Sequence, residues 1–268
     1  MKHDFKKQFG QNFLRDINAV LEFVNSSGVN GTDNILEIGP GDGAVTEFLI
    51  QQAKTVTSIE IDSALTFTLE SAFGSNDNFK LINADILKFN EEQFEHRENY
   101  KVIGSLPYNI SKKIISKFLT SNSPPQSMTV IIQKEVAEDY SAEAPKSAFI
   151  ANFASLYSDV KYLFPIPAHA FEPKPAVDGA VIQFTNIKPK HAEPLKLKKL
   201  IKIGYSSPRK KLSSNLGNVG YNKAVIEDWL KAQGLTESAR AGELTLQNWI
   251  ELYDEEAKTK TLDSPRNG

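Results

Sequence analysis

The chain has 268 residues, a formal net charge of −2 at pH 7 and a hydrophobic content of 40%. This length allows one large or two small domains, and the apolar content is ample for a core. The sequence contains no cysteine, which excludes disulfides, thiolate metal sites and cysteine nucleophiles. Its four histidines are scattered without metal-ligand spacing, so we expect no metal site.

The amino-terminal segment, residues 1–16, is charged and lacks the apolar stretch of a signal peptide. No run of the sequence approaches the ~20 apolar residues that are needed to span a membrane. These features predict a cytoplasmic protein with no membrane association.

A strand, a glycine turn and a helix form the first strong pattern. Aliphatic residues at 34–38 predict a buried parallel strand, and apolar residues at helical spacing predict a helix over 44–52. Gly39 and Gly41 allow a tight turn between them. Ligands of such sheets bind at the carboxyl ends of the strands. The G-x-G-x-x-A spacing by itself favours an NAD-type and an S-adenosylmethionine-type site about equally.

Acidic residues accompany three of the predicted strands. Glu37 lies just before the first glycine, Glu60 ends the strand at 55–59, and Asp85 follows the strand at 79–83. Glu37 could meet the ammonium group of a methionine moiety, Glu60 could bind ribose hydroxyls, and Asp85 could accept a hydrogen bond from an adenine amine. Any one of them alone is best interpreted as an ordinary strand-end carboxylate. All three, with no basic group nearby to meet a pyrophosphate, favour the cationic sulfonium cofactor S-adenosyl-L-methionine.

Further strands are predicted at 101–104 and 128–132. Their alternation with helices implies an α/β fold with a doubly wound, Rossmann-like parallel sheet. Two more strands, at 160–164 and 180–184, flank a proline-rich loop at 165–177 and predict a closing hairpin.

The tetrapeptide Ser105-Leu106-Pro107-Tyr108 ends a strand beside the predicted cofactor position. An adenine exocyclic amine is a poor nucleophile, because its lone pair is delocalised into the ring. The Ser105 hydroxyl and the Leu106 carbonyl could accept its hydrogens and free the lone pair for attack on a sulfonium methyl. Pro107 would fix the turn and Tyr108 would stack on the base. A proline turn with a core tyrosine is the simpler interpretation if the tetrapeptide stands alone; with the glycine turn it predicts methyl transfer to a nucleobase.

A linker rich in lysine and proline, residues 188–194, precedes a helical region. Helices are predicted at 195–203, 212–216, 223–232 and 246–255. The sequence therefore predicts a cofactor-binding catalytic domain at 1–187 and a small all-helical domain at 188–256. The remaining residues, 257–268, have little to bury and are expected to be disordered.

Basic residues are concentrated at 188–211, where the only acid is Glu193. Such a cluster neutralises phosphates and gives sequence-independent affinity for nucleic acid. The alternative is a solvated helix face. The candidate RNA-binding residues are Lys196, Lys199, Arg209, Lys210 and Lys211. A second basic cluster comprises Lys2, Lys6 and Lys7.

In seven motifs the sequence resembles the ribosomal RNA adenine dimethyltransferases of the KsgA type, over nearly the whole chain. The motifs lie at 8–14, 36–41, 59–62, 106–111, 133–136, 170–178 and 209–212. The resemblance implies cofactor contacts at Asn12, Leu14, Gly39, Glu60, Asp85 and Ser105, to which the glycine-turn pattern adds Glu37 and Gly41. It also implies that the target base lies between Tyr108 and Phe171.

This resemblance further implies that the product is N6,N6-dimethyladenosine at two adjacent adenosines near the 3′ end of small-subunit (16S) rRNA. The partner would be that RNA in a pre-30S ribosomal particle, with the helical domain helping to dock it. The chain is expected to act as a monomer.

Two positions and one segment depart from the family pattern and leave alternatives open. Ser105 stands where the family has asparagine, Gly179 where it usually has serine, and residues 142–153 lack its glycine and tyrosine-glycine pattern. Serine occurs at the equivalent place in other amine methyltransferases. The alternatives are a 23S rRNA methyltransferase of the antibiotic-resistance type and a non-catalytic assembly or transcription factor on the same fold. An NAD oxidoreductase leaves the tetrapeptide and the basic helices unexplained.

Overall fold

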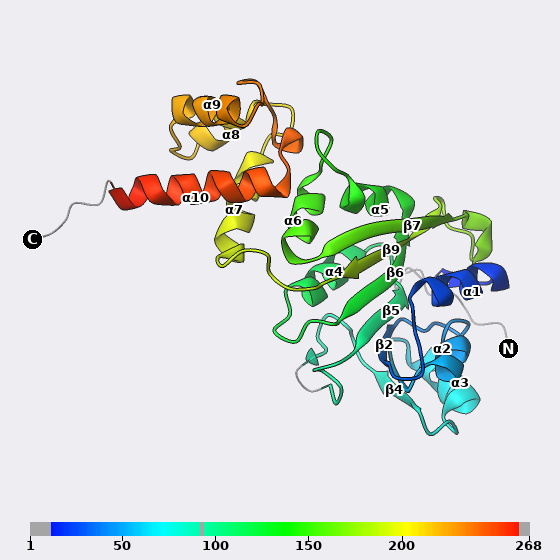
Figure 1. The fold of residues 1–268 in the computed structure, drawn as a ribbon. Helices are drawn as coiled ribbons and strands as arrows, with labels where there is room; N and C mark the ends of the chain where they lie inside the picture. Colours follow the sequence, from blue (N-terminus) through cyan, green and yellow to red (C-terminus); the bar gives the residue numbers. More distant parts are fainter. Residues whose placement is uncertain (1–11, 92–93, 263–268) are drawn as a thin grey trace, which may run out of the picture. The chain divides into compact units, whose positions relative to one another are not determined.

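The computed structural model describes residues 12–91 and 94–262, which form parts of two compact units. The first, here called the sheet unit, comprises the described residues up to Glu138 together with Ser158–Lys188. The second, the helical unit, comprises Asp139–Tyr157 and the described residues from Pro189 onward. Figure 1 shows the sheet in the first and a group of helices in the second.

The sheet unit is built on a seven-stranded sheet with the order β4-β3-β2-β5-β6-β9-β7. The bounds are β2 Asn34–Ile38, β3 Thr55–Glu60, β4 Phe79–Asn83, β5 Lys101–Ser105, β6 Ser127–Gln133, β7 Asp159–Ile166 and β9 Gly179–Thr185. Strands β2 to β6 pair in parallel, whereas β9 pairs antiparallel with both β6 and β7. Central β2 is buried along its whole length, as expected for a parallel strand that is covered on both faces.

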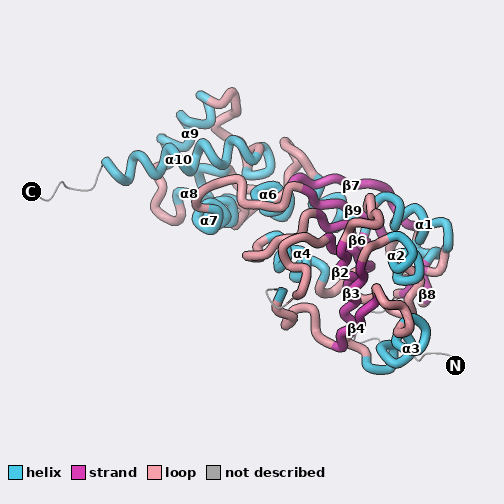
Figure 2. Tube along the Cα trace, turned by 60° about the horizontal axis from the view of Figure 1, so that its bottom comes forward, coloured by secondary structure: helices cyan, strands magenta, loops and turns pink. Residues whose placement is uncertain are grey.

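Helices cover both faces of this sheet. Helices α1 (Ile17–Ser26), α2 (Thr46–Gln52) and α3 (Ser63–Phe73) lie on one face, and α4 (Ser111–Leu119) lies on the other (Figure 2). Helix α1 begins at Asp16, whose carboxylate accepts hydrogen bonds from the first-turn amides. Its buried Val20, Phe23 and Val24 join the core over the sheet.

The glycine turn joins β2 to α2. Gly39 and Gly41 both have φ of +64°, a left-handed conformation that residues with a Cβ rarely adopt. A Cβ on Gly41 would also lie 2.6 Å from the ring of Phe13. The turn therefore requires glycine for its conformation and for the close approach of the amino-terminal segment.

That segment contributes a second, two-stranded sheet. Strand β1, Phe13–Leu14, pairs antiparallel with β8, Phe171–Glu172. A short 3₁₀ helix, Ala168–Ala170, precedes β8. The pairing brings chain segments that are more than 150 positions apart to the same side of the sheet unit.

The helical unit contains α6 (Phe149–Tyr157), α7 (Pro194–Gly204), α8 (Leu212–Gly217), α9 (Lys223–Ala232) and α10 (Leu246–Leu262). Helix α7 packs against α6, α8 and α10, and α8 packs against α9. Trp249 of α10 is completely buried. A 3₁₀ turn, Ala241–Glu243, leads into α10, and α5, Lys134–Ser141, crosses the boundary between the two units.

The predicted domain boundary at residue 187 lies one residue before the end of the sheet unit at Lys188. The helical unit, however, also includes an earlier segment of the chain. The division places Asp139–Tyr157 in the helical unit, where α6 packs against α7 and polar contacts join the segment to Tyr205. The Tyr205 hydroxyl donates to the Ser147 carbonyl at 2.9 Å, and the Asn152 amide donates to the Tyr205 hydroxyl at 2.9 Å. Helix α10 also continues past the predicted domain end at residue 256 as far as Leu262, and residues 263–268 lie outside the described part of the chain.

The predicted strands and the antiparallel pairing of the last two are confirmed. The helix predicted over 44–52 begins two residues later, at Thr46. The strand pair β1 and β8 and helices α1, α3, α4, α5 and α6 were not predicted. No helix within the described residues has the length and apolar character needed to cross a membrane.

The contact between β5 and β2 provides a test of the sheet. A Cβ on Gly104 would lie 2.4 Å from the backbone carbonyl oxygen of Ile38, and that atom belongs to a paired strand. We expect Gly104→Ala to lower the free energy of unfolding by about 1–3 kcal/mol, the usual cost of overpacking, as measured by urea denaturation. Gly31→Ala is the matched control, because its Cβ would lie 4.0 Å from the nearest atom. Equal stability of the two variants would contradict the observed strand contact.

Candidate functional site

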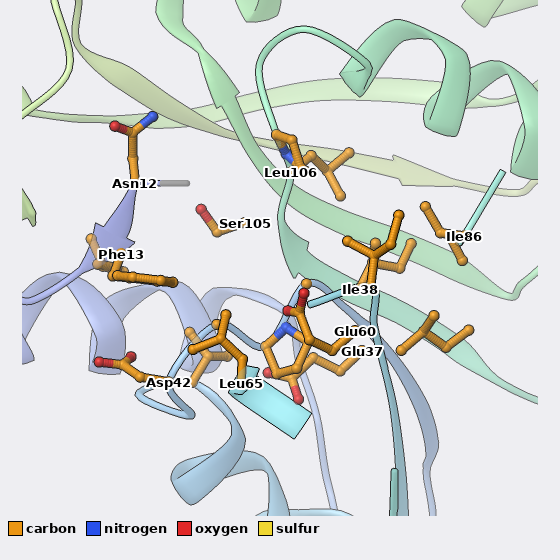
Figure 3. A pocket seen from close by; sticks show the side chains of 18 of the residues that line it. Asn12, Phe13, Glu37, Ile38, Asp42, Glu60, Leu65, Ile86, Ser105 and Leu106 are labelled. Carbon is orange, nitrogen blue, oxygen red and sulfur yellow. The ribbon is translucent and has the colours of Figure 1, made fainter. Parts of the chain in front are cut away.

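A pocket lies at the edge of the sheet where the parallel strands end (Figure 3). Its walls come from the glycine turn, from the ends of β2, β3 and β5, and from the residues after β4. The amino-terminal segment 12–14 and Phe171 of β8 complete the lining. The arrangement follows from parallel pairing, which brings the carboxyl ends of neighbouring strands to one edge.

Every residue that the sequence assigned to the cofactor or the base lines this one pocket. They are Asn12, Leu14, Glu37, Gly39, Gly41, Glu60, Asp85, Ser105, Leu106, Pro107, Tyr108 and Phe171. The structure thus brings together residues from six separate segments of the chain, and their individual roles stay predictions. The lining also includes Phe13, Asp42, Ile61 and Ile86, which the sequence reasoning did not single out. Phe13 could have been found from its place between Asn12 and Leu14.

Glu37 is almost completely buried at the base of the glycine turn. Its Oε2 accepts hydrogen bonds from the Thr46 hydroxyl at 2.8 Å and from the Ser58 hydroxyl at 2.5 Å. Burial raises the pKa of Glu37 to about 7; the two hydroxyls oppose this shift and the neighbouring Glu60 adds to it. One carboxylate oxygen is thus held by the protein, which fixes the orientation of the group.

Glu60, at the end of β3, is the second buried acid of the pocket. Its Oε1 accepts a hydrogen bond from the Asp62 amide at 2.9 Å. Burial raises the pKa of Glu60, and hydrogen bonds from backbone amides, including that of Gly41, oppose the shift. Two buried carboxyl groups beside each other are costly without a counter-charge, so the pocket favours a ligand with cationic or hydrogen-donating groups.

Asp85 lies in the loop after β4. Its Oδ1 accepts a hydrogen bond from the Leu87 amide at 2.9 Å, which holds the carboxylate in the pocket wall. The backbone before it is fixed to β3, because the Ala84 amide donates to the Glu60 carbonyl at 3.0 Å. Asp85 and Glu60 are therefore held at neighbouring strand ends.

The tetrapeptide at the end of β5 forms another wall of the pocket. The Leu106 amide donates to the Ile131 carbonyl at 2.9 Å, and the Ile110 amide donates to the Pro107 carbonyl at 3.1 Å. The first bond fixes the chain to β6, and the second closes the turn into α4. Ser105 and Leu106 are thereby presented to the pocket from a rigid strand end.

Tyr108 and Phe171 approach each other near Gly179. A Cβ on Gly179 would lie 3.2 Å from the Phe171 ring and 3.3 Å from the Tyr108 hydroxyl oxygen. That hydroxyl is buried and has no hydrogen-bond partner among the described residues. Burial, with a contribution from the charge of Asp178, raises the pKa of Tyr108 to about 12. The hydroxyl therefore stays protonated, and the neutral ring is free to stack.

The predicted RNA-binding residues belong to the helical unit. Arg209, Lys210 and Lys211 are exposed in the turn between α7 and α8, just before the helix rather than in its first turn. The Asn215 amide donates to the Ser207 carbonyl at 3.0 Å and to the Gly204 carbonyl at 2.6 Å, which anchors this turn.

The two candidate lysines on α7 differ in their surroundings. Lys196 is exposed but forms an ion pair with Glu193, whose pKa it lowers. Lys199 is exposed as well. The cluster Lys2, Lys6 and Lys7 lies outside the described residues. Within residues 12–91 and 94–262, no group of three or more His, Cys, Asp or Glu side chains is arranged to hold a metal ion.

The sheet topology, with a pocket at the carboxyl edge of the parallel strands, defines a Rossmann-like α/β fold. Two solved structures share the fold over most of their length. The 23S rRNA methyltransferase ErmE aligns with a TM-score of 0.76 and 22% identity, covering 91% of this chain and 98% of its own. A dimethyladenosine transferase from Plasmodium falciparum aligns with a TM-score of 0.74 and 20% identity, covering 92% of this chain and 98% of its own.

Sequence comparison gives the family. Residues 2–258 match the family described as ribosomal RNA adenine dimethylase, and the chain belongs to that family. Curated relatives include the ribosomal RNA small subunit methyltransferase A of Fusobacterium nucleatum, 34% identical over 94% of this chain and 97% of the relative. The protein of the same name from Staphylococcus aureus strain JH9 is 31% identical over 97% of this chain and 93% of the relative. The resemblance found in the motifs is confirmed.

The buried position of Glu37 predicts a pH dependence of stability. A carboxyl whose pKa is higher in the folded than in the unfolded chain stabilises the fold at low pH, and this contribution is lost as pH rises through about 7. Across this window Glu37 should cost the ligand-free protein about 3 kcal/mol of unfolding free energy. We expect Glu37→Gln to remove that part of the pH dependence, as measured by urea denaturation between pH 4.5 and 8.

Glu98→Gln controls for the loss of one acid, because Glu98 is exposed. If Glu37→Gln and Glu98→Gln have the same stability profile against pH, then the Glu37 carboxyl does not titrate in the buried environment described above.

Proposed function

We propose that the protein transfers methyl groups from S-adenosyl-L-methionine to N6 of two adjacent adenosines near the 3′ end of small-subunit (16S) rRNA. The product is N6,N6-dimethyladenosine, formed during ribosome biogenesis. The observation that carries this proposal is the meeting of the predicted cofactor residues and base residues in one pocket. The names of the curated relatives support the same substrate.

The residues of the pocket fit the proposed cofactor. The cofactor supplies an activated methyl group on a cationic sulfonium. Glu60 would accept hydrogen bonds from the ribose hydroxyls, and Asp85 would accept one from the adenine amine. Glu37, which is buried, would face the ammonium end of the methionine moiety, where a positive charge would favour the ionised form of the acid.

Ser105 and Leu106 act on the target amine. The serine hydroxyl and the Leu106 carbonyl would accept the amine hydrogens and leave the nitrogen lone pair free to attack the methyl group. Tyr108 and Phe171 hold the base by stacking, consistent with their approach at Gly179. Attack by the nitrogen would form the nitrogen–methyl bond as the sulfonium–methyl bond breaks, releasing S-adenosylhomocysteine, and the amine would lose one proton to solvent. Orientation of these groups by the pocket would account for much of the rate.

The helical unit supplies affinity for RNA through its exposed basic turn, Arg209 to Lys211, with Lys196 and Lys199 on α7. The partner is small-subunit rRNA in a pre-30S particle, and the protein acts as a cytoplasmic monomer.

Two alternatives are each favoured by one observation. The fold shared with ErmE favours a 23S rRNA substrate, although that identity is 22%, against 31–34% for relatives named as small-subunit enzymes. Ser105 in place of asparagine favours a non-catalytic assembly factor. Labelled methyl transfer to unmodified small and large subunits, followed by nucleoside analysis, distinguishes the three.

Variants of the tetrapeptide test the roles within the pocket. We expect Ser105→Ala to lower the single-turnover rate on small subunits with little change in cofactor affinity, and Ser105→Asn to raise it, because an amide oxygen reaches farther than a hydroxyl. Tyr108→Ala should be more damaging than Ser105→Ala, since stacking on a base contributes about 1–3 kcal/mol. Tyr108→Phe is the matched control, because it removes only a hydroxyl without a partner among the described residues.

Retention of activity in Tyr108→Phe but not in Tyr108→Ala supports stacking. Inactivity of both the wild type and Ser105→Ala, with transfer restored in Ser105→Asn, would contradict an active enzyme and favour the assembly factor.

The basic turn provides a separate test of docking. Replacing Arg209, Lys210 and Lys211 with alanine should lower affinity for small subunits and reduce the slope of log affinity against log salt by roughly two to three. Binding of S-adenosylhomocysteine, measured by calorimetry, should be unchanged. The control replaces three exposed lysines of the sheet unit, Lys54, Lys80 and Lys88. An equal salt slope in the triple variant and the wild type would show that the turn does not meet phosphate.

A further inference from the structure

Arg15 connects the two sides of the pocket. Its Nη1 forms an ion pair with Asp42 of the glycine turn, and its Nε donates to Glu172 of β8 at 3.3 Å. Its guanidinium carbon also lies 5.6 Å from the centre of the Phe13 ring. One side chain therefore contacts the turn on the cofactor side and the strand that carries Phe171 on the base side.

Each partner of Arg15 is attached to a wall of the pocket. Asp42 itself lines the pocket, and it follows Gly41, against which the Phe13 ring packs. Glu172 is the neighbour of Phe171, whose buried ring lines the pocket from β8. A short path of charged groups thus links the glycine turn to β8.

The strand pair that this path spans is short. Strands β1 and β8 have two residues each, and isolated two-stranded pairs of this kind are marginally stable. Beyond the side chain of Arg15, its backbone amide donates to the Ala170 carbonyl at 2.7 Å, and Leu14 and Phe171 are buried in the core. The position of Phe171 therefore depends on a few contacts, two of which are made by Arg15.

Stability alone gives a weak account of this arrangement. The side chains of Arg15 and Glu172 are 43% and 62% exposed, and partly exposed ion pairs contribute little to folding. The arrangement instead joins two segments that must be correctly placed at the same time, when the cofactor and the base are both bound.

We propose that Arg15 is a positioning residue that couples occupation of the cofactor side to ordering of β8 and hence of Phe171. The inference rests on the proposed function for the identity of the base side. Ligand binding at the glycine turn fixes Asp42, Asp42 fixes the guanidinium, and the guanidinium holds Glu172. The base side is then ordered when a methyl donor is present.

Hydrogen exchange of the full-length protein tests this coupling without requiring methyl transfer. In the wild type, S-adenosylhomocysteine should slow exchange in peptides covering the glycine turn and also in peptides covering residues 168–174. In Arg15→Gln the turn should still be protected, whereas ligand-induced protection of residues 168–174 should fall about five-fold, near the upper limit for a partly exposed ion pair. Asp42→Asn and Glu172→Gln should reproduce this loss, because each breaks one arm of the path.

Lys101→Gln is the control for a purely structural effect. It removes an ion pair with Asp33, 2.7 Å long, at the amino end of β5 and away from the pocket. A variant with a purely structural effect raises the hydrogen-exchange rate both with and without S-adenosylhomocysteine. The ratio of the two rates stays unchanged.

Equal protection of residues 168–174 in the wild type and Arg15→Gln would overturn the proposal, as would no protection there in the wild type. Methyl transfer to small subunits is measured with the same wild-type preparation. Its absence, with the protection pattern intact, would count against the proposed function and not against the coupling.

Discussion

Parallel pairing of β2 with β3 and β5 is the constraint on which the site depends. In register, Ile38 pairs with Ile59 and with Gly104, so that the three strands end at nearly the same level. The residues that follow, from the glycine turn, from Glu60 onward and from Ser105 onward, must then share one edge. Functional residues that are separated by some seventy positions of sequence are brought to this edge by the backbone hydrogen bonds between the strands.

The two buried carboxyl groups of the pocket favour binding of a ligand with cationic or hydrogen-donating groups. Glu37 and Glu60 are both buried, and burial raises the pKa of each. Removing two neighbouring carboxyl groups from water costs free energy that their hydroxyl and amide partners only partly offset. Selection for stability alone would favour apolar residues at positions 37 and 60. Their place at the ends of adjacent strands fits a ligand that carries a positive charge and hydroxyl groups, as the proposed cofactor does.

Much of the sheet and of the pocket could be predicted from the sequence, because aliphatic runs such as 34–38 end in acids or in the Ser105 tetrapeptide. The amino-terminal wall could not. Strand β1 has two residues, too few for any periodicity, and its partner β8 lies more than 150 positions away. Phe171 entered the site only through a resemblance to a family. The placement of Asp139–Tyr157 in the helical unit depends on contacts such as that between Tyr205 and Ser147, which no local pattern encodes.

Ser105 and Gly179 can be considered together, because both are smaller than the residues that the resemblance leads one to expect. Gly179 lies where a Cβ would be 3.3 Å from the Tyr108 hydroxyl, and that hydroxyl has no partner in the described part of the chain. A serine at this position would bring a hydroxyl close to it, whereas glycine leaves the ring held by packing alone. At position 105 a short hydroxyl takes the place of a longer amide. Compared with the family pattern, both residues shorten or remove a polar side chain on the base side of the pocket. The acidic residues of the cofactor side are present. Under the proposed function, placement of the adenine then depends more on the Leu106 carbonyl and on the rings of Tyr108 and Phe171. The same proposal makes precision on the base side depend on how firmly β5 and β8 hold those groups.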